Sequence, residues 1–394
     1  MTLVEFLLLA LRVAIVAVAP LLIVIFLIWF ERRFAARVQD RLGPNRVGPN
    51  GLFQTFADAI KLVLKEDITP AGTDKVAYNL SPIIAVMAVV LIWAALPLSP
   101  RLIGVNVEIG VLYIVAVASL GTLAIMMAGW SSNNKYALLG AFRSVAQLVS
   151  YEVPLVMSLL IPVMLASSLG MQNLVLAQQQ VWFVFMAPVA AFIFFISSQA
   201  ETGRGPFDLI EAESELVAGF NIEYSGMKFG LFFAGEFAHV FTNGILMANL
   251  FLGGWWGLGV SATDGSILSD LLGVFYVVLK AMVFYLFSLL LRNSMPRVRI
   301  DQMMNFNWKF LVPVSIVNLL VTAFLLKLAQ LGGFGIAPGQ IDLLTNANPI
   351  NLLPVTLLLL GGNVVVILGT LAVFGRQTRT ERLATERAAV AVGD

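Results

Sequence analysis

Residues 109–130 of the chain read IGVLYIVAVASLGTLAIMMAGW, a run that contains no charged side chain. An α-helix of about 20 apolar residues crosses the hydrocarbon core of a bilayer, so this run predicts a transmembrane helix. Eight further apolar runs are separated from it and from one another by polar segments or by segments rich in Gly and Pro. The nine predicted spans centre near Val16, Leu91, Ala118, Leu160, Ala190, Phe241, Val283, Leu320 and Val364.

The composition of the whole chain agrees with this interpretation. Of the 394 residues, 59% are hydrophobic and only 12% are charged. Soluble domains average about 25% charged residues, so the composition indicates a membrane protein. The sequence predicts an all-α, polytopic transmembrane helical bundle with about nine spans. We expect one transmembrane domain over residues 1–375 and a basic cytoplasmic tail over residues 376–394.

Charge and cysteine content exclude several classes of function. The 24 Lys and Arg nearly balance 23 Asp and Glu, which leaves no basic excess for binding nucleic acid. The absence of Cys and the presence of one His exclude disulfides, iron–sulfur clusters, thiolate zinc sites and bis-His haem. We therefore expect no cofactor or metal bound by this chain, and any redox centre must belong to a partner.

The distribution of Lys and Arg predicts the orientation, because short cytoplasmic loops of membrane proteins retain these residues. Most of them fall after predicted spans 1, 3, 5 and 7 and in the tail, whereas the opposite side carries only Arg101 and Lys327. We expect the N-terminus outside and the tail inside. The first run is too long for the core of a signal peptide, so it is interpreted as a retained span.

Residues 31–80 form the first predicted cytoplasmic loop. Its segment RLGPNRVGPNG, residues 41–51, is rich in Gly, Pro and Asn and predicts a rigid, irregular turn. From Leu52 to Lys65 the apolar residues follow a helical period, which predicts an amphipathic helix in the membrane interface. Either this helix only seats the chain in lipid, or it forms the lip of an opening for a molecule with a polar head and an apolar tail. In the second case Phe53 and Phe56 would face the tail.

The third predicted cytoplasmic loop, residues 200–229, follows predicted span 5 and is strongly acidic. Its carboxylates outnumber the two cations Arg204 and Lys228, so local ion pairing cannot neutralise them. Like charges and partial burial both favour proton uptake, so some of these groups could hold or pass a proton. A solvated acidic loop is the alternative. The six acids are Glu201, Asp208, Glu211, Glu213, Glu215 and Glu223.

Ionisable residues also occur within the predicted spans. Glu152, Glu236 and Lys280 would each cost at least ~2.5 to 3.5 kcal/mol at the bilayer centre, so a functional role is the default hypothesis. With the loop acids they suggest a hydrated route from the inner face into the membrane. His239 lies one helical turn after Glu236 and could equally make an ordinary polar contact between helices.

With these segments in view, the sequence resembles the H-subunit family of respiratory NADH:quinone oxidoreductase, complex I, the family at the heel of the membrane arm. The matching motifs run from about residue 31 to about residue 310 and are spread over many segments, which makes the resemblance specific. They include ERR at 31–33, GPNRVGP at 43–49, FADAIKL at 56–62, GW at 129–130, NKYAL at 134–138 and SYE at 150–152. Further along the chain they include PFDL at 206–209, ESELV at 213–217, NIEY at 221–224, PR at 296–297 and DQ at 301–302.

The resemblance implies that the chain forms part of a quinone-binding chamber and couples quinone reduction to proton translocation. The quinone passage it implies runs along Arg32, Arg41, Arg46, Phe53, Asp58, Lys61 and Phe233. The proton connection it implies uses Glu31, Glu152, Glu201, Asp208, Glu211, Glu213, Glu215, Glu223 and Glu236. We expect Lys280 to join this connection because it is an ionisable residue within a predicted span. We expect structural and electrostatic roles for Arg204, Arg297, Arg299 and Asp301, although the last three could form an ordinary positive-inside anchor. Phe237 stands where the family often has Tyr, which removes a phenol hydroxyl.

The resemblance also implies partners and a location. Soluble iron–sulfur subunits would dock on the cytoplasmic face, with FMN and clusters held by partner subunits, and small membrane-arm and antiporter-like subunits would pack in the bilayer. The last span and the Arg-rich tail resemble those of bacterial members, which implies a bacterial cytoplasmic (inner) membrane. A membrane subunit of an energy-converting hydrogenase and a stand-alone proton-coupled transporter remain as alternatives. The sequence does not distinguish ubiquinone from menaquinone as the substrate.

Overall fold

The computed structural model describes residues 3–208, 218–261, 266–331 and 352–372, and all regular elements in these ranges are helical. This confirms the predicted all-α, polytopic class. The long helices are α1 (Leu3–Val38), α3 (Lys75–Ala95), α4 (Gly110–Ser131), α5 (Lys135–Ala166), α8 (Pro188–Glu201), α10 (Gly226–Phe251), α11 (Ile267–Ser294), α13 (Val312–Leu331) and a final helix, Leu352–Ala372. Shorter elements are η1 (Pro49–Gly51), α2 (Gln54–Leu64), α6 (Met171–Leu176), α7 (Phe183–Met186), η2 (Gly219–Asn221), α12 (Ile300–Phe306) and η3 (Asn307–Leu311).

Each of the nine predicted span centres lies in one of the long helices. Seven helices in the described part of the chain are long and apolar enough to cross a membrane, if α12, η3 and α13 are taken as one span. The remaining two centres lie in α1 and in the shorter apolar helix α8. The total of nine and the outside position of the N-terminus remain predictions.

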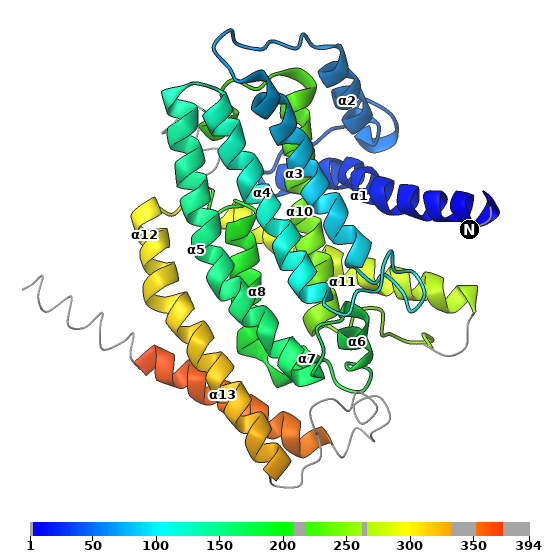
Figure 1. Ribbon diagram of the computed structural model, residues 1–394, viewed down its shortest axis with the longest axis vertical. Helices are drawn as coiled ribbons and strands as arrows, with labels where there is room; N and C mark the ends of the chain where they lie inside the picture. The colour runs from blue at the N-terminus through cyan, green and yellow to red at the C-terminus, as the bar shows by residue number, and fades with distance from the viewer. Residues whose placement is uncertain (1–2, 209–217, 262–265, 332–351, 373–394) are drawn as a thin grey trace, which may run out of the picture.

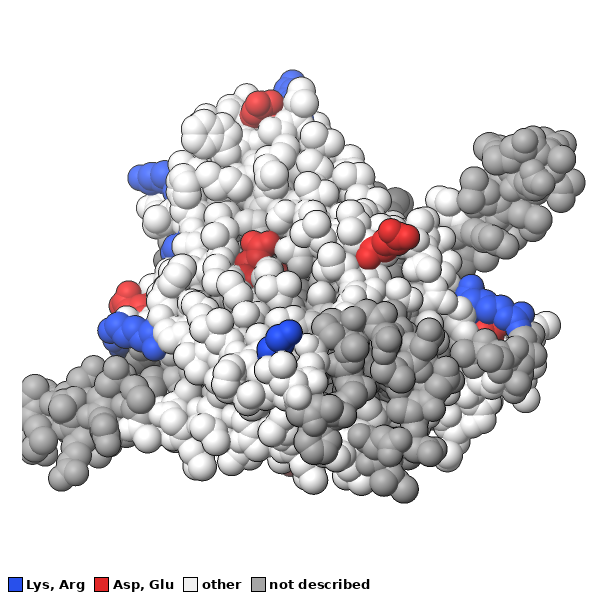
Figure 2. Space-filling view, turned by 60° about the horizontal axis from the view of Figure 1, so that its bottom comes forward, with Lys and Arg blue, Asp and Glu red and all other residues white. Residues whose placement is uncertain are grey.

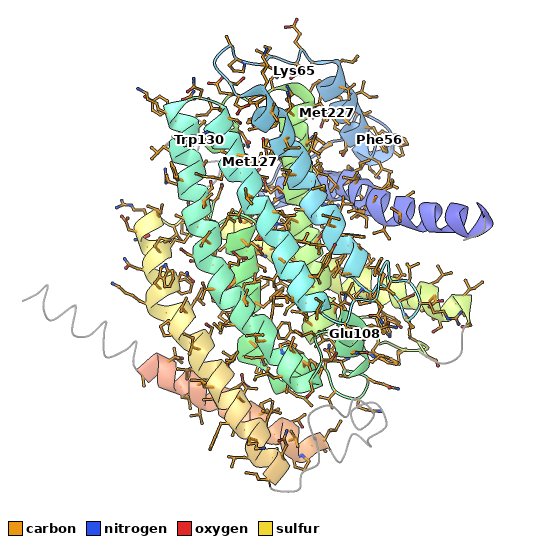
Figure 3. The ribbon with its side chains drawn as sticks, in the orientation of Figure 1. Phe56, Lys65, Glu108, Met127, Trp130 and Met227 are labelled. Atoms are coloured by element: carbon orange, nitrogen blue, oxygen red, sulfur yellow. The ribbon has the colours of Figure 1, made fainter. Side chains whose placement is uncertain are left out.

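The helices α3, α4 and α5 run side by side, while α1 leaves the bundle at a steep angle to them (Figure 1). Figure 2 brings the end of the bundle opposite α2 forward, and charged side chains are few and scattered over the described part of that face. Figure 3 shows Phe56, Lys65, Trp130 and Met227 toward one end of the bundle and Glu108 toward the other. These labelled residues belong to or border the segments after predicted spans 1, 3 and 5, which therefore have described parts at the end that carries α2.

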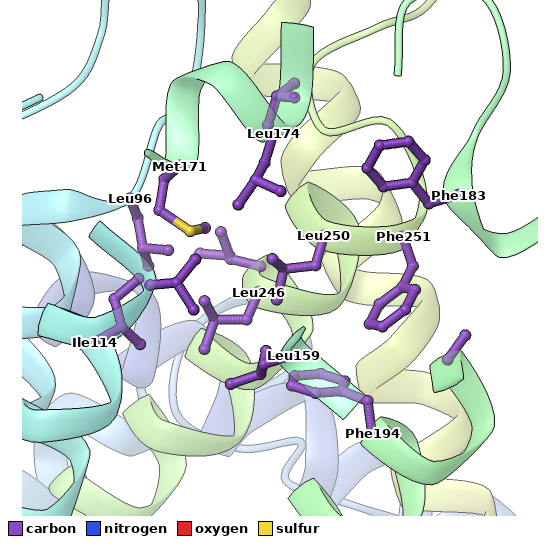
Figure 4. Packing of buried hydrophobic residues seen from close by; sticks show 14 of the residues in the cluster. Leu96, Ile114, Leu159, Met171, Leu174, Phe183, Phe194, Leu246, Leu250 and Phe251 are labelled. Atoms are coloured by element: carbon purple, nitrogen blue, oxygen red, sulfur yellow. The ribbon is translucent and has the colours of Figure 1, made fainter. Parts of the chain in front are cut away.

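The core of the bundle is built around α10. Two thirds of its apolar window, 67%, is buried, compared with 28% for α4, so α10 is the central helix and α4 lies at the periphery. Leu246, Leu250 and Phe251 of α10 pack with Leu96, Ile114, Leu159, Met171, Leu174, Phe183 and Phe194 (Figure 4). This packing fixes the position of the polar residues that α10 carries closer to the α2 end.

The first loop folds as its composition predicts. The segment before α2 is irregular, and Gly51 adopts a positive φ of 73° with its Cα so close to Pro44 that a Cβ would lie 2.3 Å from the Pro44 carbonyl oxygen. The amphipathic helix is confirmed as α2, with a solvent- or lipid-facing apolar side in which Val63 is 64% exposed. Trp29 and Arg33 of α1 both donate hydrogen bonds to the Asn50 carbonyl oxygen at 3.1 Å, which attaches the loop to α1.

Candidate functional site

A cavity of about 110 Å³ opens in the half of the bundle near α2, between α3, α4, α8, α10 and η2. One water needs about 10–15 Å³ of such volume, so the cavity has room for several waters. Five predicted site residues line it: Glu201, Arg204, Asp208, Phe233 and Glu236. His239 and Arg292 also line it.

Arg204 is the centre of an ion network at this cavity, and its side chain is only 2% exposed. Its Nη1 donates to both carboxylate oxygens of Glu31, at 2.7 and 2.9 Å. Its Nε lies 3.1 Å from Oε1 of Glu236. The guanidinium also stacks over the Phe237 ring, with 4.3 Å between its carbon and the ring centroid. One cation thus joins α1, the segment after α8 and α10.

The protonation state of Arg204 follows from these contacts. Burial would by itself lower the pKa of the guanidinium, but the carboxylates of Glu236 and Glu31 outweigh that effect and raise the pKa above its ordinary value. Arg204 is therefore a permanent positive charge. Its place in the cavity wall fits the electrostatic role expected from the sequence, and that role remains a prediction.

Glu31 is the most heavily bound carboxylate of the network. It is 7% exposed, and besides Arg204 it accepts hydrogen bonds from Arg292 of α11 and from the hydroxyl of Tyr285, the latter at 2.7 Å. Arg292 and Tyr285 are seven positions apart, which places them on one face of α11. The sequence identifies Arg292 only as one of the Lys and Arg residues after predicted span 7, and it gives no reason to select Tyr285. Their spacing is the signal that could have linked them.

The segment after α8 is held in place by Gln147 of α5, which sequence reasoning also missed. Its fully buried amide Nε2 donates to the carbonyl oxygens of Ala200, at 2.6 Å, and Phe207, at 2.8 Å. Arg204 lies between these two residues. Gln147 therefore fixes the turn that directs the guanidinium toward Glu31 and Glu236.

Glu201 has weaker partners than Glu31. Its Oε2 accepts a hydrogen bond from Asn243 Nδ2 at 3.3 Å, and its Oε1 lies 3.9 Å from His239 Nε2. Glu152 is half-buried on α5, outside the cavity wall but within electrostatic range of Glu201. Glu201 is thus a second carboxylate beside the Arg204 network, and its neighbours are an amide, an imidazole and another carboxylate rather than an arginine.

Glu223 lies at a different anchor, at the far end of the acidic loop. Its Oε1 accepts a hydrogen bond from Asn134 Nδ2 at 2.7 Å, and its backbone carbonyl accepts one from the Tyr78 hydroxyl at 2.6 Å. The rings of Tyr78 and Tyr224 stack with 4.2 Å between centroids. Burial raises the pKa of Tyr224, partly offset by hydrogen bonds from Ser131 and Ser81, so its phenol is neutral. Glu211, Glu213 and Glu215 lie outside the described residues.

Lys280 is not brought to the cavity. Its Nζ donates to the carbonyl oxygens of Gly254, at 2.8 Å, and Trp256, at 2.9 Å, and lies 4.5 Å from the centre of the Trp182 ring. These contacts attach α11 to the segment after α10. The predicted membership of Lys280 in the proton connection has no geometric support from the described contacts and remains a prediction.

The predicted quinone-passage residues divide into two groups. Phe233 lines the cavity, whereas the others lie on α1, α2 and the turn between them. Arg32 and Asp58 form an ion pair at 2.5 Å that joins α1 to α2, and the Phe53 and Phe56 rings lie 6.2 Å apart on the exposed side of α2. Arg41, Arg46 and Lys61 are exposed.

The basic cluster at the start of α12 does not contribute side chains to the cavity wall. Arg297, Arg299 and Asp301 are exposed and do not line the cavity. This exposure fits the anchor interpretation as well as the electrostatic one. Within the described ranges, no group of three or more His, Asp or Glu residues is arranged to hold a metal ion.

Comparison with known proteins agrees with the motifs in the sequence. A sequence model of the NADH dehydrogenase family matches residues 11–323. The chain is 48% identical over 306 residues to the NADH-quinone oxidoreductase H subunit of Dehalococcoides mccartyi, which covers 78% of this chain and 83% of that protein. For the H subunit of Carboxydothermus hydrogenoformans the identity is 45% over 307 residues, with coverage of 78% and 86%. For the H subunit numbered 2 of Geobacter sulfurreducens it is 42% over 324 residues, with coverage of 80% and 95%. Identity of this degree over most of both chains confirms the resemblance, and the chain belongs to the H-subunit family of NADH-quinone oxidoreductases.

Proposed function

We propose that this chain is a membrane-arm subunit of a proton-translocating NADH:quinone oxidoreductase, that it forms part of the quinone chamber, and that it couples quinone reduction to proton movement through buried carboxylates. The observation that carries the proposal is the cavity in which the buried Arg204 binds Glu31 and Glu236 while Glu201 and Asp208 share the same wall. The reaction itself, oxidation of NADH by quinone, is taken from the names of the relatives.

The carboxylates at this cavity have different environments, which suggests a division of roles. Protonation of Glu31 would weaken its ion pairs with Arg204 and Arg292 and its hydrogen bond with Tyr285. Protonation of Glu201 would disturb only contacts with an amide and an imidazole. We infer that Glu31 fixes the position of the cation and that Glu201 and Glu236 exchange protons with waters in the cavity.

The coupling is electrostatic. Reduction of a quinone to a quinol takes up two protons, so the charge near the headgroup changes during turnover. In a low dielectric, such a change acts over longer distances than in water. A redistribution of protons among Glu201, Asp208 and Glu236 would then transmit the event to charges deeper in the membrane.

The electrons must come from elsewhere, because the chain has no Cys and one His. Soluble iron–sulfur subunits with FMN in the assembly would dock at the end of the bundle that carries α2. Quinone would enter beside α2, where Phe53 and Phe56 present apolar rings next to the Arg32–Asp58 pair. The location would be the cytoplasmic membrane of a bacterium, with small membrane-arm and antiporter-like subunits as neighbours in the bilayer.

The test is Glu201→Gln and Glu236→Gln in the assembled enzyme, with Glu108→Gln as a matched control because Glu108 is exposed at the opposite end of the bundle (Figure 3). We expect quinone-linked NADH oxidation to fall at least tenfold in both variants, while NADH oxidation with ferricyanide and the Glu108→Gln enzyme remain unchanged. Full quinone reductase activity and proton pumping in both cavity variants would refute the proposal.

The same preparation distinguishes the alternatives. A stand-alone transporter would be isolated without soluble iron–sulfur subunits. A hydrogenase subunit would be isolated with nickel and without quinone-sensitive activity. Either result would replace the proposal, because the quinone reaction requires both the iron–sulfur partners and a quinone.

A further inference from the structure

A second cavity, of about 280 Å³, lies between α1, the C-terminal end of α3 and the turn that follows α3. Its wall is formed by Val16 and Ala19 of α1, by Trp93 and Leu96 of α3, and by the turn that follows α3, including Leu102 and Ile103. Residues of both α1 and α3 line it, and these two helices diverge at a steep angle (Figure 1). It is separate from the cavity at Arg204, with which it shares no lining residue.

The interior of this second cavity is apolar. The polar atom that Trp93 could offer, Nε1, already donates to Thr242 Oγ1 at 2.7 Å. The backbone N–H groups of Leu98 and Val105 donate to the carbonyl oxygens of Leu102 and Ala94 at 3.0 and 2.7 Å. A ligand inside this cavity would therefore be held by apolar contact, as a hydrocarbon chain would be.

The charge among the lining residues comes from Arg101, which is half-exposed. Its Nε lies 3.9 Å from Oδ2 of Asp270, which is beyond hydrogen-bond distance and gives a surface pair of little strength. The other oxygen of Asp270 accepts a hydrogen bond from Ser99 at 3.1 Å. The guanidinium thus retains donors for an anion at the side of the cavity.

The turn that carries Arg101 is fixed on several sides. Ser99 Oγ accepts from the backbone N–H of Leu102 at 3.0 Å, and Gln172 of α6 donates to the Pro100 carbonyl at 3.1 Å. Gly104 packs directly on α3, where a Cβ would lie 2.6 Å from the Ala94 carbonyl oxygen. The backbone of the turn is therefore already ordered, and only the side chain of Arg101 has to be ordered when it binds an anion.

We propose that this cavity binds an anionic phospholipid of the membrane, with one acyl chain in the apolar space and the phosphate on Arg101. A neutral apolar molecule such as a quinone would fill the space without using the guanidinium. An anionic lipid uses both features, because guanidinium N–H groups bind phosphate oxygens well and its headgroup carries no cation, such as choline, that would compete with Arg101. Arg101 is also one of only two Lys or Arg residues that the sequence assigns to the loops on the outer side, so few other cations there would compete for an anionic headgroup.

The test uses the intact assembly, stripped of lipid in detergent and then titrated with phosphatidylglycerol or phosphatidylcholine carrying a spin label. The variants are Arg101→Gln, which removes the cation, and Ala19→Phe, which fills the cavity. Lys327→Gln is the matched control, because Lys327 is the other cation on that side and is exposed on α13. We expect phosphatidylglycerol to bind about tenfold more weakly in Arg101→Gln, the loss expected for one charged hydrogen bond.

Ala19→Phe should weaken the binding of both lipids, and Lys327→Gln should change neither. Equal binding of phosphatidylglycerol to the wild-type and Arg101→Gln enzymes would overturn the proposal. Equal affinity of the wild-type enzyme for the two lipids would also overturn it. Quinone reductase activity in the presence of excess lipid, expected to be unchanged in Arg101→Gln, confirms that the variant has folded.

Discussion

Replacement of Arg204 by Gln is the sharpest perturbation of the cavity. The side chain is 2% exposed and pairs with Glu31 and with Glu236, which lines the cavity, so Gln would leave these two carboxylates without their shared cation. Removal of one partner from a buried ion pair costs about 3–5 kcal/mol. Because Glu31 keeps Arg292 and Tyr285, we take the lower value, about 3 kcal/mol.

Arg292→Gln is the matched comparison. Arg292 also binds Glu31, but its side chain is 38% exposed, and exposed ion pairs contribute about 0–1 kcal/mol. The two variants therefore differ by roughly 2 kcal/mol, or about 30-fold in an equilibrium constant. We expect the Arg204→Gln enzyme to assemble poorly and to lose quinone reductase activity at a much lower temperature than the Arg292→Gln enzyme.

The assay measures assembled enzyme in membranes, quinone reductase activity per assembled enzyme, and the temperature at which that activity is half lost. A second substitution sharpens it, because removing both members of a buried pair is less harmful than removing one. Arg204→Gln combined with Glu236→Gln should therefore be no less stable than Arg204→Gln alone, because Glu31 keeps Arg292 and Tyr285 whereas Glu236 loses its ion pair with Arg204. Equal inactivation temperatures for Arg204→Gln and Arg292→Gln, or a double variant much worse than Arg204→Gln, would refute the reasoning.

Three further substitutions probe the supporting structure. Lys280→Met leaves the Gly254 carbonyl unpaired, so we expect the free energy of unfolding to fall by about 1–3 kcal/mol, measured as a lower inactivation temperature. Proton pumping per quinone reduced should not change, and reduced pumping would instead support a proton role for Lys280. Tyr224→Phe removes the 2.8 Å hydrogen bond with Ser81, and because burial raises the pKa of the phenol, we expect the variant to lower the inactivation temperature without altering the pH profile. Gly51→Ala should cost at least about 1 kcal/mol through its positive φ and raise the apparent KM for quinone, and a wild-type KM would argue against a role of this turn in quinone entry.

The helices could be predicted because their signals are local. An uncharged run such as 109–130 has few alternatives to a transmembrane helix, and the apolar period over residues 52–65 requires a helix with one apolar face. The turn before α2 was predictable for the same reason, since Gly51 needs a conformation that other residues adopt at a cost. These features depend on neighbours in the sequence, and the structure agrees with them.

The arrangement of the site was not predictable in the same way. Glu31 and Arg204 are 173 positions apart, and Glu31 and Arg292 are 261 apart, so nothing local in the sequence states that they meet. The composition indicated that the acids needed positively charged partners, but it did not indicate which Lys or Arg residues these would be. Lys280 was predicted to join the acids because it is an ionisable residue in a span. In the structure it instead donates to two backbone carbonyl oxygens and does not line the cavity.

If the carboxylates at the cavity take up protons as we propose, the charges there require that they act as a set rather than one by one. Among the described residues, Arg204 and Arg292 supply two positive charges, while Glu31, Glu201, Asp208 and Glu236 could supply four negative ones. Full ionisation would leave the site negative inside a poorly polarisable bundle, and each proton taken up would lower that excess. Because Arg204 binds Glu31 and Glu236 together, a proton on Glu236 leaves the cation to Glu31 alone. The protonation of one carboxylate therefore changes the field at the others, which is the property that a coupling element between a quinone and distant proton sites requires.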